Sequence, residues 1–150
     1  MNARKIALDI LMDVEGQKAY SNIAIQDNLA GHEISHLDKK LITEIVYGVL
    51  ENKIYLDFII GQLSKIKLSD LDKTIKMILR MGLYQILYLD KIPTFAIVNE
   101  SVKLAKKANF KASGYVNGIL RNFLRNQRKI KIPTIKDEPI KYLSIKYDYR

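Results

Sequence analysis

The sequence predicts an all-α fold of about seven helices, arranged as one bundle or as a pair of small bundles around a central helix. Apolar residues recur at helical spacing through most of the chain. No segment alternates with period two over strand length except Lys129–Ile135, where Pro133 favours an extended linker instead. The third observation is one stretch that is apolar on nearly all sides.

That stretch is Ser69–Leu89, which we expect to form the central helix. Ser69 followed by Asp72 resembles a capping box, and Pro93 prevents extension at the other end. A helix that is apolar all round is buried on every side or lies in a membrane. Because Lys76, Arg80 and Gln85 interrupt the run, we predict a buried helix and no membrane span.

Capping residues and apolar spacing predict the other helices. We expect them from Asn2 to Gly16, from Tyr20-Ser21 to before Gly31, from Ser35 through Leu50, after Asn52-Lys53 through Leu63, from Thr94 to about Ala108 and from Ser113 to about Gln127. We interpret the third and fourth of these as separate helices, with one kinked helix as the alternative. Asn2, Ser35, Thr94 and Ser113 are the predicted caps. In the first helix Leu8 and Met12 fall opposite the main apolar stripe, so they are either ordinary exposed residues or a second contact surface.

Composition narrows the class of protein. The 150 residues allow one domain with a real core, and 48% are hydrophobic. The chain has no cysteine, which excludes disulfides, thiolate metal sites and a cysteine nucleophile. His32 and His36 have the spacing of a metal pair but no further ligand nearby, so we predict no metal site. No signal-peptide pattern opens the sequence, and we expect a cytoplasmic protein.

The net charge of +9 is concentrated near one end of the chain. Residues 1–102 hold 12 Lys and Arg against 13 Asp and Glu, a net charge of −1. Residues 103–150 hold 13 against 3, a net charge of +10. This asymmetry is typical either of a polyanionic partner bound at one end of the molecule or of a solvated basic tail.

The predicted seventh helix carries the clearest chemistry. Arg121, Arg125 and Arg128 share a stripe with Gly114 and Gly118, opposite the apolar residues. The glycines leave the backbone bare, and guanidinium groups suit phosphate oxygens, so the pattern favours a nucleic-acid surface. The alternative is a solvated face with a glycine-mediated helix crossing. Further candidates for this basic surface are Lys103, Lys106 and Lys107, and elsewhere in the chain Arg4 and Lys5.

Other polar residues fit structural roles. Glu100 lies three residues before Lys103, which favours a surface ion pair, and Asn117 lies at the edge of an apolar face, which favours a structural hydrogen bond. The sequence contains no phosphate loop, no glycine-rich loop after a strand and no histidine beside paired acids. We therefore expect a chain that binds and does not catalyse.

The segment from Ile92 to Arg125 resembles the NusB family of RNA-binding domains. The matching elements are Ile92-Pro93, Asn99-Glu100-Ser101-Val102, Leu104-Ala105-Lys106 and Tyr115–Arg121. Within that family the segments Ala3–Glu15, Ala19–Leu29 and Asp38–Ile60 resemble the amino-terminal domain of the bacterial 16S rRNA methyltransferase B group (RsmB, also Sun or Fmu). Free-standing NusB factors usually have aspartate where this chain has Arg121, and they end soon after the last helix.

The resemblance implies an all-α fold in two small bundles, with residues 1–128 as the RNA-binding domain and 129–150 as a linker toward a methyltransferase domain. The implied parent enzyme transfers a methyl group from S-adenosylmethionine to carbon 5 of a cytosine in 16S ribosomal RNA. The implied partners are 16S rRNA and the methyltransferase domain, with no cofactor in this chain. Two alternatives are a free NusB-type antitermination factor and a docking module that contacts no RNA.

Overall fold

The computed structural model describes residues 2–17 and 20–127. This part of the chain forms seven α-helices and two short 3₁₀ helices and contains no strand, which confirms the predicted all-α class. The helices are α1 (Ala3–Gln17), α2 (Ser21–Leu29), α3 (His36–Glu51), α4 (Lys53–Leu63), α5 (Lys73–Tyr88), α6 (Thr94–Ala108) and α7 (Ser113–Asn126), with η1 (Leu68–Asp70) before α5 and η2 (Phe110–Ala112) before α7.

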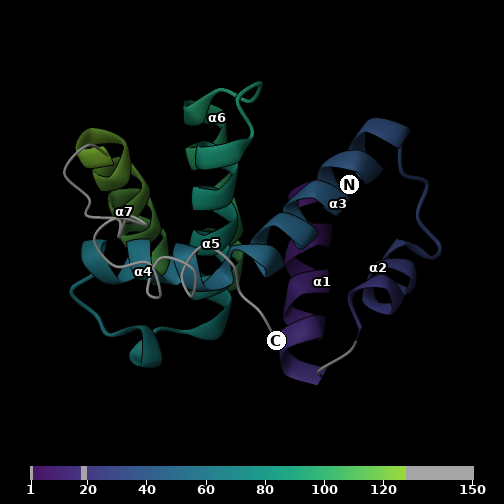
Figure 1. Cartoon of the computed structure of the whole chain (residues 1–150), viewed down its shortest axis with the longest axis horizontal. Helices are drawn as coiled ribbons and strands as arrows, with labels where there is room; N and C mark the ends of the chain where they lie inside the picture. Colours follow the sequence, from purple (N-terminus) through teal and green to yellow (C-terminus); the bar gives the residue numbers. More distant parts are fainter. Residues whose placement is uncertain (1, 18–19, 128–150) are drawn as a thin grey trace, which may run out of the picture.

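The helices form two bundles that share α5 (Figure 1). Helices α1, α2 and α3 pack on one another at one side of the molecule, and α4, α6 and α7 pack around α5 at the other. Helix α5 also contacts α1 and α3, so it joins the bundles into one continuous apolar core. This is the predicted arrangement of two small bundles around a central helix.

The central helix is shorter at its start than the sequence predicted. It begins at Lys73, and its cap is Asp72, whose side chain accepts a hydrogen bond from the backbone N–H of Ile75 at 3.0 Å. Ser69 instead lies in η1, and Leu71, between that turn and the helix, is buried. Because Leu71 must reach the core before the helix starts, the chain bends there. The prediction of Ser69 as the helix start was wrong.

Two predicted caps are confirmed and two are wrong. The side chains of Asn2 and Ser35 accept hydrogen bonds from the backbone N–H groups of Arg4 and Asp38 at 2.9 and 3.1 Å. Thr94 and Ser113 are the first residues inside α6 and α7, and the residues before them provide no side-chain cap. The hydroxyl of Ser113 donates to the carbonyl of Phe110 at 2.8 Å and closes η2 instead.

The third and fourth predicted helices are separate. The chain leaves helical geometry at Asn52 (φ −112°, ψ 15°), between α3 and α4. The predicted linker 129–150 and Arg128 lie outside the described residues. None of the helices in the described ranges is long and apolar enough to cross a membrane.

Candidate nucleic-acid interface

Helix α7 has one face in the core and one face that no other part of the described chain covers. Val116, Ile119, Leu120 and Phe123 are buried. On the other side Gly114 and Gly118 are exposed, and a Cβ added to either would meet no atom within 4 Å. The alternative of a glycine-mediated helix crossing is therefore excluded within the described residues, and the backbone here is open to an approaching molecule.

The arginines continue this open face. Arg121 and Arg125 are exposed, and neither guanidinium pairs with a carboxylate of residues 2–17 or 20–127. The Nε of Arg121 donates to Oδ1 of Asn117 at 2.9 Å, one turn earlier on the same helix. That bond confirms the structural role predicted for Asn117, and it orients the guanidinium while leaving its two terminal nitrogens free. We call Gly114, Gly118, Arg121 and Arg125 the α7 arginine face.

Some of the remaining cations gather at a different place, between α1 and α6. Lys5 and Lys107 line one pocket between these helices. Lys103 lies one turn before Lys107 on α6 and pairs with Glu100 at 3.7 Å, as predicted for Glu100. The charge of Glu100 also acts on Arg4 of α1. We call Arg4, Lys5, Lys103 and Lys107 the α1–α6 seam.

The four cations of the seam differ in how far the protein already engages their side chains. Arg4 is half-buried, and its Nε donates to Oε1 of the buried Gln85 at 2.8 Å. Burial lowers the pKa of Arg4, and the charges of Glu100 and Asp38 oppose that change. Since Arg4 is already engaged inside the protein, Lys5 and the α6 lysines are the more available phosphate ligands. Lys106 is exposed in the last turn of α6 but does not line the pocket.

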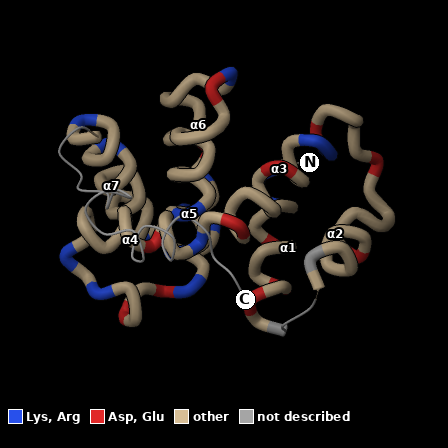
Figure 2. The backbone as a smooth tube through the Cα atoms, viewed as in Figure 1, with Lys and Arg blue, Asp and Glu red and all other residues tan. Residues whose placement is uncertain are grey.

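The structure therefore divides the predicted site residues between two places. Helix α7 lies at one edge of the molecule and α1 toward the other, with α5 and α6 between them (Figure 1). Basic positions mark the end of α7 at that outer edge (Figure 2). The sequence pattern predicted that the α6 lysines share a surface with the arginines. That pattern carries no signal that Lys107 faces α1. Whether either place binds RNA stays a prediction.

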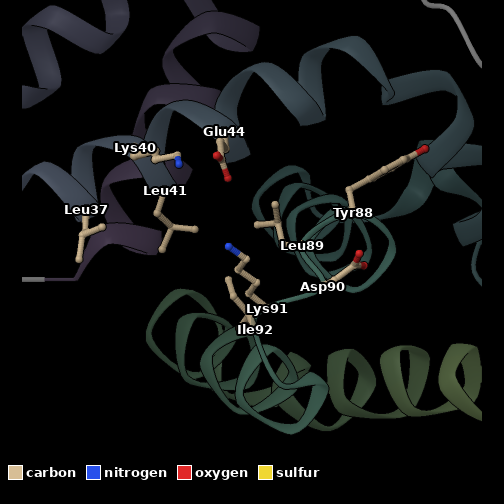
Figure 3. A pocket seen from close by; sticks show the side chains of 9 residues that line it. All are labelled: Leu37, Lys40, Leu41, Glu44, Tyr88, Leu89, Asp90, Lys91 and Ile92. Carbon is tan, nitrogen blue, oxygen red and sulfur yellow. The ribbon is translucent and has the colours of Figure 1, made fainter.

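A larger pocket of about 380 Å³ lies where α3 meets the end of α5 (Figure 3). Its apolar walls are Leu37, Leu41, Leu89 and Ile92. Its charged groups are Lys40, Glu44, Asp90 and Lys91, and the side chains of Glu44 and Lys91 point into the same space (Figure 3). Two cations and two anions give no net attraction for a polyanion. This pocket is consequently a weaker candidate for nucleic acid.

The one buried cation of the described core was not anticipated as a functional or structural centre. Arg80 of α5 is 2% exposed and reaches Asp57 of α4 and Glu15 of α1. No group of three or more His, Cys, Asp or Glu side chains within the described ranges has the geometry to hold a metal ion. His32 and His36 are both exposed.

Comparison with known proteins identifies the family. The profile of the NusB family matches residues 1–125. The chain belongs to the NusB family. This NusB domain is also similar to a solved chain from "Crystal Structure of a Plectonemic RNA Supercoil", with a TM-score of 0.77 and 18% identity over 86% of this chain and 96% of that one. At that identity the likeness establishes the fold alone.

Relatives of two kinds match this domain. It is 37% identical to a probable ribosomal RNA small subunit methyltransferase B from Synechocystis sp. over 87% of this chain and 30% of that protein. It is 38% identical to the probable enzyme of the same name from Bacillus subtilis, over 83% of this chain and 28% of that protein. It is 34% identical to the transcription antitermination protein NusB of Acetivibrio thermocellus, over 79% of this chain and 83% of that protein. The chain thus spans less than a third of the methyltransferase relatives.

Proposed function

We propose that this NusB-family domain binds RNA and positions an S-adenosylmethionine-dependent methyltransferase on 16S ribosomal RNA. The observation that carries the RNA-binding part is the α7 arginine face, where two guanidinium groups with no carboxylate partner in residues 2–17 and 20–127 lie beside bare helix backbone. Arginine forks match phosphate oxygens, and glycine lets a sugar–phosphate strand come close to the helix. The two methyltransferase relatives at 37% and 38% identity support the choice of rRNA modification.

The domain itself supplies no methyl-transfer chemistry in this proposal. The chain has no cysteine to attack the pyrimidine ring. When bound to a catalytic domain elsewhere, S-adenosylmethionine would supply the methyl group. The role of this domain is then to add affinity for the rRNA and to hold the target nucleotide near that catalytic domain, which raises the effective concentration of substrate.

A free antitermination factor is the second candidate. It is favoured by the NusB relative of Acetivibrio thermocellus, of which the alignment covers 83%. The two functions predict different RNA partners and different effects on a separate enzyme. In the antitermination case the domain acts on nascent leader RNA and has no effect on rRNA methylation.

The two functions are separated by adding the domain to the catalytic region of the B. subtilis relative, expressed without its own NusB-like region. If the proposal holds, the added domain binds a 16S rRNA fragment and increases methylation of it. A variant of the domain with Lys39→Gln and Lys40→Gln on α3 removes two exposed lysines away from α7 and should behave like the parent. RNA binding without stimulation would favour the antitermination factor, and stimulation without RNA binding would favour the docking module.

A further inference from the structure

The pocket on the α1–α6 seam combines an apolar floor with a cationic rim. It holds about 300 Å³. Its apolar residues are Leu8 and Met12 of α1 and Leu104 and Ala108 of α6. Leu8 and Leu104 are buried, while Met12 is half-buried and Ala108 is exposed at the mouth. Leu8 is therefore not one of the ordinary exposed residues that the sequence allowed: it belongs to the core, and Met12 packs against that core beside the pocket.

The rim carries two lysines from different helices. Lys107 is exposed and pairs with no carboxylate of the described chain. Lys5 pairs with Asp9 one turn later, but these side chains are 48% and 45% exposed, respectively. An ion pair so open to water contributes little and can be exchanged for a phosphate at low cost. Both lysines are therefore available to a strand that crosses the pocket.

Cationic and polar groups extend this pattern. Arg4 and Lys103 lie one residue and one turn away from the rim lysines, and with them the seam has four cations against three carboxylates, Asp9, Glu100 and Asp38. The pocket is also lined by Asp9, whose carboxylate is a hydrogen-bond acceptor, and by Thr74, whose hydroxyl is able to donate and to accept. An apolar floor with two polar groups suits a flat heterocycle that has an apolar face and a hydrogen-bonding edge.

We propose that this pocket takes one unpaired base of an RNA strand while Lys5 and Lys107 contact the phosphates on either side. The inference rests on the proposed RNA-binding function and names the substrate form, a single strand or loop. A volume of about 300 Å³ is at the low end for ligand pockets, which suits one base and not a base pair. A base held in a duplex cannot enter a gap between two helices, whereas an unstacked base can.

The direct test follows the methyl group of Met12 by NMR in the parent protein during titration with a short single-stranded RNA. A base over the pocket floor shifts this methyl signal upfield through its ring current. Met77 and Met81, which are 2% and 1% exposed in the core, should stay unmoved. RNA binding that leaves the Met12 signal in place would overturn the pocket inference and leave the RNA-binding function standing.

A pocket-filling variant gives the second test. Ala108→Phe adds a ring at the mouth and changes no charge, and Ala30→Phe adds the same ring at an exposed position outside this pocket. Because stacking on one base contributes about 1–3 kcal/mol, Ala108→Phe should weaken single-strand binding about tenfold. The parent should bind a duplex of the same strand length more weakly than the single strand, and Ala108→Phe should not change duplex binding. Ala30→Phe should match the parent for both RNAs.

Four other outcomes decide against the inference or against the function on which it rests. If the parent binds single strand and duplex equally, and Ala108→Phe changes neither affinity, the pocket inference is overturned and the RNA-binding function stands. Cytidine monophosphate shifting Met12 at the same concentrations as the RNA would assign the pocket to free nucleotides. Loss of binding to a methyltransferase catalytic region in Ala108→Phe, with RNA binding intact, would assign it to a protein partner. Absence of any RNA binding by the parent would overturn the proposed function itself.

Discussion

Arg80 and Asp57 are joined by two parallel hydrogen bonds across the interface of α5 and α4. Nε of Arg80 lies 2.7 Å from Oδ1 of Asp57, and Nη2 lies 2.9 Å from Oδ2. Nη1 donates to Oε2 of Glu15 on α1 at 2.9 Å. One buried guanidinium therefore ties the central helix to a helix of each bundle.

Replacing Arg80 by alanine should destabilise the fold strongly. Removing one partner from a buried pair typically costs about 3–5 kcal/mol, and partial exposure of both carboxylates places this case near the lower end. The measurement is the free energy of unfolding from a denaturant titration. Lys5→Ala serves as the control, because it breaks the exposed pair with Asp9 and should cost less than about 1 kcal/mol. Similar losses in the two variants would mean that the buried network contributes no more than a surface pair.

The same network makes stability depend on pH. Burial raises the pKa of Glu15, but the hydrogen bond and charge of Arg80 outweigh it and leave the pKa below its ordinary value. Because the pKa of Glu15 is lower in the folded than in the unfolded chain, its ionised form stabilises the fold. This stabilisation is complete above the pKa of the unfolded chain, about 4.3, and is lost as pH falls through the pKa of the folded chain. The free energy of unfolding should therefore decrease below about pH 5. Glu15→Gln should show a smaller decrease, and an identical pH profile would remove Glu15 as a contributor.

Another prediction concerns the close packing of α3 against α5. A Cβ added to Gly48 of α3 would overlap the ring of Tyr84 on α5. Gly48→Ala should destabilise the protein by about 1–3 kcal/mol, since the ring must move out of its packed position. Combining it with Tyr84→Leu should remove most of that cost. A double variant whose free energy of unfolding equals the sum of the two single effects would show that the two residues do not interact.

Gly118, on the α7 arginine face, has free space around it, unlike Gly48. A Cβ there meets no atom within 4 Å, so Gly118→Ala should stabilise the helix by up to about 1 kcal/mol. If a strand approaches the bare backbone, the same methyl group should weaken RNA binding. A thermal melt and a binding titration of one variant thus test both effects. A variant that is more stable and binds RNA as tightly as the parent would show that bare backbone is not used.

Local patterns predicted the helices because helix formation depends on residues close in sequence. The order of the seven helices, the buried stripe of α7 and the separation of α6 from α7 all follow from apolar spacing, although the caps predicted for α6 and α7 were wrong. The start of α5 did not, because burial of Leu71 by distant helices sets it. The Arg80 network joins residues 23 and 65 positions apart, and the approach of Lys5 to Lys107 spans still more of the chain. Such contacts leave no periodic signal.

The most direct test of the account is the salt dependence of binding to a 16S rRNA fragment. Each phosphate contact contributes about 0.7–0.9 to the slope of log K against log salt. The double variant Arg121→Gln, Arg125→Gln keeps the buried stripe of α7, so it should fold normally, bind more weakly and show a slope shallower by about 1.5. Lys39→Gln, Lys40→Gln removes the same charge from α3 and should leave the slope unchanged. A slope in the arginine variant equal to that of the parent would contradict the assignment of α7 to RNA.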